Sequence, residues 1–281
     1  MPTRPARHRH RARGRLGTFL GSGPGRAVAA LAVLAVLTAV AVLLVGRDRP
    51  DGTPADGADA ASSGASTDPA LADLLSWADR ELPVDARLRA DPGVRAGLLA
   101  AGAPEELMAP AGPDDAVLAV AADGEEPDGR VVARFGNLAV VDPSPGVPTP
   151  EQLDRRRALA DAVLANPTMR APEDAAAVLR SGDVDMRLLS LLAALVARQG
   201  VQVATFPASE GAEGPARSML LGAVGGEPLG TGRPGTEALQ TWLEAQLPPY
   251  APDRVEVTED GVLLTYRYAS DPDALVAEVS P

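Results

Sequence analysis

The chain of 281 residues contains no cysteine and no lysine, and both of its histidines, His8 and His10, lie within the first ten residues. Without cysteine no structural disulfide can form, so an exported domain must be stabilised by a hydrophobic core, which about 200 residues can supply. All 26 basic residues other than histidine are arginine. Together with the abundant Ala, Gly and Pro, this indicates the codon bias of a high-GC bacterial genome rather than a chemical requirement.

These absences exclude most mechanisms of exported hydrolases. Zinc hydrolases draw on His ligands, and Ser-His, Ser-Lys and Cys-His nucleophiles each need a residue type that is missing after residue 10. No lysine exists for a pyridoxal Schiff base, and no Gly-rich loop ends in Lys-Ser or Lys-Thr for a nucleoside triphosphate. Catalysis would have to rest on carboxylates, arginine, hydroxyls or a carboxylate-bound metal, and no cofactor is predicted.

Glycoside hydrolysis is a reaction that needs only two carboxylates, held roughly 5 to 10 Å apart. The candidate catalytic residues are Asp183 and Asp185 before a Leu-rich segment, or Glu105 and Glu106. The chain has only two Trp, three Tyr and three Phe, whereas sugar sites usually need aromatic platforms. The alternative interpretation is that Asp183 or Asp185 caps a helix, and that Glu105 and Glu106 are solvated.

An acidic segment could bind a hard cation through carboxylate oxygens. Asp123, Glu125, Glu126 and Asp128 are candidate Ca²⁺ ligands. Their spacing departs from the EF-hand pattern, which has Gly at the sixth position, where this chain has Asp128. A solvated loop between two strands is the alternative.

The charges are distributed unevenly along the chain. The first 47 residues contain eight Arg and no acidic residue, and the remainder contains 18 Arg against 38 Asp and Glu. Residues 27–46 form an apolar run whose only polar side chain is Thr38, and a helix of this length rises about 30 Å, the thickness of the hydrocarbon core. A cleaved signal peptide has a shorter apolar region, of roughly 7 to 15 residues. The run therefore predicts an uncleaved signal anchor, with a cleaved signal peptide and a buried globular helix as alternatives.

The flanks of this run predict its orientation. Cytoplasmic flanks are enriched in Arg and Lys, and seven Arg precede the run while only Arg47 and Arg49 follow it closely. Residues 1–26 are therefore expected to be a basic cytoplasmic tail that meets anionic lipid headgroups. The remainder is expected outside the membrane, and its excess of acidic residues disfavours nucleic-acid binding.

The extracytoplasmic part is expected to have two regions. Residues 47–67 are small, polar and turn-forming, which predicts a flexible linker. Residues 68–281 predict an α/β or α+β domain with a mixed sheet flanked by helices, because helical and strand patterns alternate. A sub-boundary is possible near residues 142–149.

Local signals place the elements of this domain. Asp-Pro pairs open helices at Pro69 and Pro92, and a capping box opens a helix at Pro150. Further helices are expected over 172–180, 185–199 and 236–246, and the Leu-rich segment 185–199 is expected to be the most buried. Strands are expected over 84–90, 116–121, 130–135, 138–141, 201–206 and 219–224, followed by a C-terminal hairpin of 254–258 and 262–268.

Two further patterns carry expectations. Arg155, Arg156 and Arg157 are interpreted as the exposed face of a helix with acidic neighbours. Residues 74–83 and 239–248 share the pattern L-x-x-W-x-x-x-x-L-P and contain the only two Trp. This repetition reflects either an internal duplication or two amphipathic helices that happen to end in Leu-Pro.

Two stretches together carry a resemblance to a family. Residues 74–104 (LLSWADRELPVDARLRADPGVRAGLLAAGAP) and 179–207 (LRSGDVDMRLLSLLAALVARQGVQVATFP) resemble uncharacterised single-pass membrane proteins of actinobacteria. The resemblance implies a basic tail, an Ala-rich anchor and an α/β ectodomain, and no established activity. The second stretch also resembles the helix and strand that lead into the metal site of some bacterial cell-wall peptidases, where Ser-Gly-His follows the strand. Here residues 208–211 read ASEG, and no His follows, so the metal chemistry would be absent.

These observations favour a non-catalytic module anchored in the cell membrane. It would bind or scaffold another component of the cell envelope, either a membrane protein or a wall polymer. The alternative is a carboxylate-dependent hydrolase of wall glycans.

The predicted topology can be tested with single cysteines, because the native chain contains none. We expect Ser66→Cys to react with an impermeant thiol reagent on intact cells and Thr18→Cys to react only after lysis. Labelling of Thr18→Cys but not Ser66→Cys on intact cells would contradict the orientation.

Overall fold

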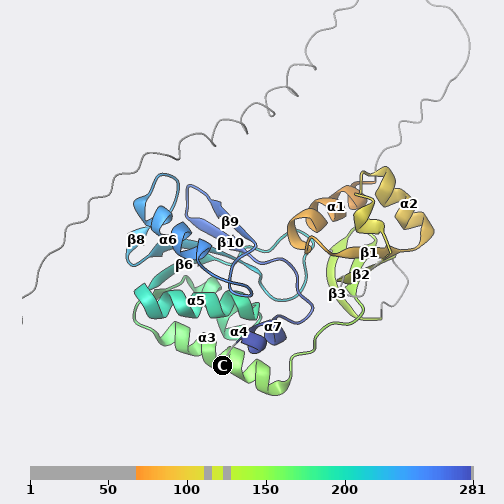
Figure 1. Ribbon diagram of the computed structural model, residues 1–281. Helices are drawn as coiled ribbons and strands as arrows, with labels where there is room; N and C mark the ends of the chain where they lie inside the picture. The colour runs from red at the N-terminus through yellow and green to blue at the C-terminus, as the bar shows by residue number, and fades with distance from the viewer. Residues whose placement is uncertain (1–67, 111–115, 123–127, 280–281) are drawn as a thin grey trace, which may run out of the picture. The chain divides into compact units, whose positions relative to one another are not determined.

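The computed structural model describes residues 68–110, 116–122 and 128–279. The predicted tail, membrane span and linker lie outside these residues, as do Asp123, Glu125 and Glu126. Among the helices of the described ranges, none has the length and apolar character needed to cross a bilayer. The fold is a mixed α/β fold with two mixed sheets and seven described α-helices, and Ser63–Pro281 forms one compact unit (Figure 1).

The first half of the unit contains a four-stranded sheet with strand order β1-β2-β4-β3. Strand β1 is parallel to β2, and the other pairs are antiparallel. The elements are α1 (Pro69–Glu81), β1 (Arg87–Ala90), α2 (Pro92–Ala100), the 3₁₀ helix η1 (Glu106–Met108), β2 (Val117–Ala122), β3 (Arg130–Phe135) and β4 (Leu138–Asp142).

The caps predicted for the first two helices are present. The Asp68 carboxylate accepts a hydrogen bond from the amide of Ala70, and the Asp91 carboxylate accepts bonds from the amides of Gly93 and Val94. In each helix Pro occupies the first turn, where its missing N–H costs nothing.

The first hydrophobic cluster includes side chains from α1, α2 and the four-stranded sheet. Leu74 and Trp77 of α1 are fully buried in it, at the three-residue spacing of one helix face. The Trp77 ring lies 5.8 Å from the Phe135 ring of β3. Tyr268 also belongs to this cluster, so a residue from near the C-terminus completes the first core.

The second half contains a sheet with the order β5-β6-β7-β10-β9, with β8 paired to β7. Strands β5 and β6 are parallel, and the remaining pairs are antiparallel. The elements are α3 (Pro150–Ala165), β5 (Met169–Arg170), α4 (Glu173–Ser181), α5 (Met186–Gln199), β6 (Val201–Thr205), β7 (Ser218–Val224), β8 (Glu227–Pro228), α6 (Pro234–Glu244), β9 (Arg254–Val257), β10 (Val262–Thr265) and α7 (Pro272–Val279).

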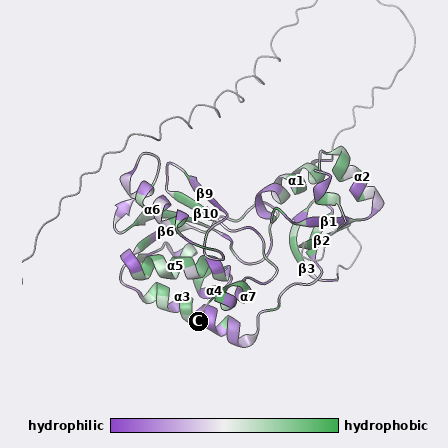
Figure 2. Ribbon diagram, viewed as in Figure 1, coloured by the Kyte–Doolittle hydropathy of each residue, from purple (hydrophilic) through white to green (hydrophobic). Residues whose placement is uncertain are grey.

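Helix α5 is central to the second hydrophobic cluster. It packs against α3, β6 and β7, and its residues Leu188, Leu192 and Leu195 have no exposed surface. Figure 2 shows that α3, which lies beside α5, carries both hydrophobic and hydrophilic residues. The Leu-rich helix therefore has the buried position that its sequence predicted.

Three local features differ from what the sequence predicted. The second strand of the C-terminal hairpin, expected over 262–268, ends at Thr265. The strand expected from residue 84 begins only at Arg87, because Val84 lies in a turn with 89% of its surface exposed. The chain has a further Asp-Pro pair at Asp271-Pro272. It begins α7, whose Ala274 amide donates to the Asp271 carboxylate. No helix was predicted there, because the segment lacks the Leu-rich pattern of the first two.

The two Trp-containing helices have different surroundings. Helix α1 is followed by β1, which pairs in parallel with β2, whereas α6 is followed by the antiparallel hairpin β9–β10. Trp77 lies in the first hydrophobic cluster, and Trp242 packs against the second. The internal duplication therefore gains no support from the topology.

The central position of α5 predicts the cost of a cavity. We expect Leu192→Ala to lower the free energy of unfolding by about 2 to 5 kcal/mol, the range for emptying a buried Leu site. Leu247→Ala is the matched control, because Leu247 is 76% exposed and its truncation should stay within about 0.5 kcal/mol. Equal denaturant midpoints for the two variants would contradict the assignment of the core.

Candidate functional site

Residues 206–217, between β6 and β7 of the second sheet, contact strand β3 of the first sheet. The Arg134 amide of β3 donates to the Gly211 carbonyl, and the Glu213 amide donates to the Val132 carbonyl. Each of these hydrogen bonds has a length of 2.8 Å. The Arg134 guanidinium also pairs with the Glu213 carboxylate at 2.8 Å. The segment therefore adds backbone pairing to the outer edge of β3.

Gly211 permits this close approach. Its φ is +74°, and a Cβ at this position would lie 2.5 Å from the Arg134 carbonyl oxygen. A side chain would both clash there and strain the backbone. Residues 211–213, which follow strand β6, are thus used for contact between backbones.

A buried ion pair holds the other end of this segment. The Glu81 carboxylate, at the end of α1, accepts hydrogen bonds from Arg217 Nη2 at 3.0 Å and Nε at 3.3 Å. The Ser209 hydroxyl donates to the other Glu81 oxygen. Glu81 and Arg217 are almost fully buried, so each charge depends on the other for compensation.

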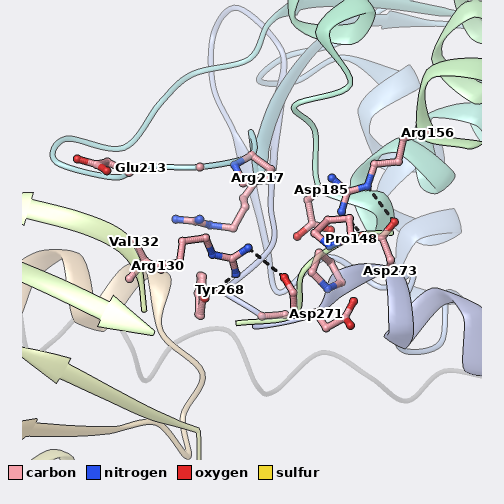
Figure 3. Close-up of a pocket in the computed structure, with 15 residues that line it drawn as sticks. Arg130, Val132, Pro148, Arg156, Asp185, Glu213, Arg217, Tyr268, Asp271 and Asp273 are labelled. Carbon is pink, nitrogen blue, oxygen red and sulfur yellow. Dashed lines mark hydrogen bonds and ion pairs between the residues drawn. The ribbon is translucent and has the colours of Figure 1, made fainter. Parts of the chain in front are cut away.

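Tyr268 lies close to two arginines, one of which belongs to this pair. The Arg217 and Arg130 guanidinium carbons lie 5.6 and 5.8 Å from the centre of its ring, and Figure 3 shows both side chains extending toward Tyr268. Its hydroxyl donates to the Asp142 carboxylate at 2.6 Å and accepts from Arg130 Nη2 at 2.8 Å. Burial and the Asp142 hydrogen bond raise the pKa of Tyr268 to about 12, so the hydroxyl is a fixed donor at neutral pH.

Asp185, a candidate catalytic residue, is the N-cap of α5. Its carboxylate accepts from the Arg187 amide at 2.9 Å and from Arg187 Nε and Nη2 at 3.0 and 2.8 Å. Burial lowers the pKa of Arg187, but the Asp185 hydrogen bond and charge outweigh burial and raise it. Arg187 Nη2 also donates to the Arg267 carbonyl. Asp185 therefore combines a helix cap with a buried ion pair, consistent with the capping interpretation.

The expectation for the three consecutive arginines of α3 was wrong for one of them. Arg156 is buried and forms a two-point ion pair with Asp273 of α7, shown as a dashed line in Figure 3. Burial disfavours its charge, but the Asp273 hydrogen bond raises its pKa overall. Arg156, Ala160 and Val163 form the buried face of α3. Their four- and three-residue spacing was a signal in the sequence that Arg156 points inward.

Two cavities lie beside the contacts that residues 206–217 make with the first half of the unit. A cavity of about 40 Å³ is lined by residues from both halves, including Arg130, Arg217 and Tyr268, and is drawn in Figure 3. A cleft of about 220 Å³ lies along residues 206–217 and is lined by Asp183, among others. Asp183 is exposed, and its carbonyl accepts from the Ala216 amide at 2.9 Å. The two candidate residues therefore differ in environment: Asp183 is exposed to solvent, whereas Asp185 is buried and paired with Arg187.

The remaining candidate site residues that the structure describes line neither of these cavities. Glu105 and Glu106 are exposed at η1. Asp128 is exposed just before β3, and the other three candidate calcium ligands lie outside the described residues. Within the described ranges, no group of three or more His, Asp or Glu side chains is placed to hold a metal ion.

No protein-family model, no curated protein and no solved structure matches the chain.

The buried ion pair predicts a strong coupling between α1 and β7. We expect Arg217→Met to destabilise the protein by about 3 to 5 kcal/mol, because it leaves Glu81 buried without a counter-charge. The double variant Glu81→Leu/Arg217→Met should be more stable than Arg217→Met alone, as measured by urea denaturation.

The exposed pair Arg180–Glu173 is the matched control. Its side chains are 52% and 81% exposed, and Arg180→Met should cost no more than about 1 kcal/mol. Additive effects of the Glu81 and Arg217 substitutions would contradict the coupling.

Proposed function

We propose that the chain is a membrane-anchored, non-catalytic binding or scaffolding module of the cell envelope, with its α/β domain on the extracytoplasmic side. The supporting observation is the state of the buried carboxylates. The four buried acidic residues in the described part of the chain each bond to an Arg or Tyr side chain: Glu81, Asp142, Asp185 and Asp273. Glu81, Asp185 and Asp273 also line the two cavities, but each of these carboxylates is paired there with an arginine.

This arrangement argues against the carboxylate-dependent glycan hydrolase. Such an enzyme needs a protonated acid and a second carboxylate that face one substrate site. Asp185 accepts bonds from Arg187 at both of its oxygens, and Asp183 is solvated, so the two do not form a matched pair. Of the eight aromatic side chains, Trp77, Phe135, Tyr266 and Tyr268 are buried in the cores. Among the described residues, Phe206 is the one aromatic side chain that lines the cleft with Asp183.

The sequence supports the location and the class of partner. The apolar run 27–46 would hold the chain in the bilayer, and the Arg-rich tail before it would fix the tail in the cytoplasm. The domain would then face membrane proteins and wall polymers at the cell surface. Binding to one of these components, without turnover, is the activity we infer.

The proposal can be tested with the full-length chain in detergent, mixed with purified peptidoglycan and wall polysaccharide. We expect no release of soluble sugar or peptide, and we expect the protein either to co-sediment with a polymer or to crosslink to a specific membrane protein in native membranes. Glycan cleavage that Asp183→Asn or Asp185→Asn abolishes without lowering the melting temperature would establish the hydrolase instead. Asp185→Ala should lower stability, because it removes a helix cap worth about 0.5 to 2 kcal/mol.

A further inference from the structure

The four-stranded sheet has two edges that differ in their neighbours. The β3 edge receives residues 211–213 of the β6–β7 segment. At the other edge, β1 pairs only with β2 among the residues that the structure describes. A strand paired on one side directs part of its amides and carbonyls outward, where another extended chain can bind.

A groove lies along β1 and has an unusual charge. It has a volume of about 450 Å³ and passes between β1 and the residues that end η1. Among the described residues, three arginines and no acidic residue line it, although acidic residues outnumber arginines by 38 to 18 after residue 47. The lining consists of Arg87, Leu88, Arg89, Ala90, Arg95, Met108, Ala109, Pro110 and Val117. Arg87 already has a partner, so Arg89 and Arg95 are the arginines of the groove that could meet an anionic ligand.

Two of these guanidinium groups are open to a ligand. Arg89 is exposed on β1, and Arg95 is exposed on α2, where Nη1 donates to the Met108 carbonyl beside the groove. Neither pairs with a carboxylate of the described residues. The nearby Asp91 carboxylate already accepts two backbone amides at the start of α2. Arg89 and Arg95 thus keep N–H donors available for an anionic partner.

We propose that this groove binds an acidic, extended polypeptide segment of an envelope protein, which adds to the sheet beside β1. The inference rests on the proposed binding function and names its surface and partner. The β1 edge would supply backbone hydrogen bonds, and Arg89 and Arg95 would pair with carboxylates on the segment. A strand places alternate side chains on the same face, so a segment with Glu or Asp at every second residue fits this surface. A polypeptide is favoured over a wall polyanion because an open strand edge recognises a backbone.

The test measures binding of a fluorescent, end-capped octapeptide of alternating Glu and Val to the full-length chain in detergent. We expect saturable binding that Arg89→Gln/Arg95→Gln weakens by about tenfold or more, equivalent to about 1.4 kcal/mol. Arg155→Gln is the matched control, because Arg155 is an exposed arginine of α3 outside the groove, and it should leave the affinity unchanged. Circular dichroism of the groove variants should be unaltered, since both side chains are exposed.

Two further peptides separate strand addition from simple charge attraction. Replacing each Glu by Gln should abolish binding, and methylating alternate backbone nitrogens should weaken it at least as strongly as the double Arg substitution. Equal binding of the methylated peptide, with displacement by polyphosphate, would show a polyanion site and overturn the proposal. Unchanged affinity of the Arg89→Gln/Arg95→Gln variant would overturn it as well. Glycan cleavage by the protein would refute the non-catalytic function while leaving these peptide results to decide the groove.

Discussion

The arrangement of the two sheets depends on the compensation of one buried carboxylate, that of Glu81. This residue ends α1, and its burial against the first core would be prohibitive without a partner. Arg217 and Ser209 supply the partners from opposite ends of the segment before β7. Because both ends are held at α1, the residues between them are brought against the edge of β3. One charge therefore fixes the course of a segment that has little hydrophobic content of its own.

The same device recurs at the other buried acids. Asp142 accepts a hydrogen bond from the Tyr268 hydroxyl, which in turn accepts one from Arg130. Asp273 forms an ion pair with Arg156. Buried pairs of this kind add little net stability over apolar residues of the same volume. A wrong pairing, however, would leave a buried charge without a counter-charge. We infer that the contacts of Glu81 and Asp142 select one arrangement of the two halves and that the Asp273–Arg156 pair fixes α7 against α3, while the hydrophobic clusters supply the driving force.

Features that depend on neighbours in the chain could be predicted from the sequence. The Asp68, Asp91 and Thr149 caps act within three residues, and the corresponding helices begin where the caps predicted. The Leu repeat of α5 likewise marks a buried face. The order of the strands could not be predicted, because it depends on contacts between distant residues. The burial of Arg217 has no local signature, since the acid that neutralises it lies 136 residues away. Arg156 was the exception: its spacing from Ala160 and Val163 indicated an inward position, but its charge suggested an exposed one.

The participation of Tyr268 in the first hydrophobic cluster has a consequence for the order in which the protein forms. Its partners Arg130 and Asp142 precede it by 138 and 126 residues. The chain is synthesised from its N-terminus, so all four strands of the first sheet are made before Tyr268. Until then Asp142 lacks its hydroxyl donor and the first core lacks its last ring. The first half therefore lacks these contacts until the C-terminal part of the chain is made. Because the contacts join residues far apart in the sequence, we expect the docking of Tyr268 onto the first half to be a slow, late step of folding.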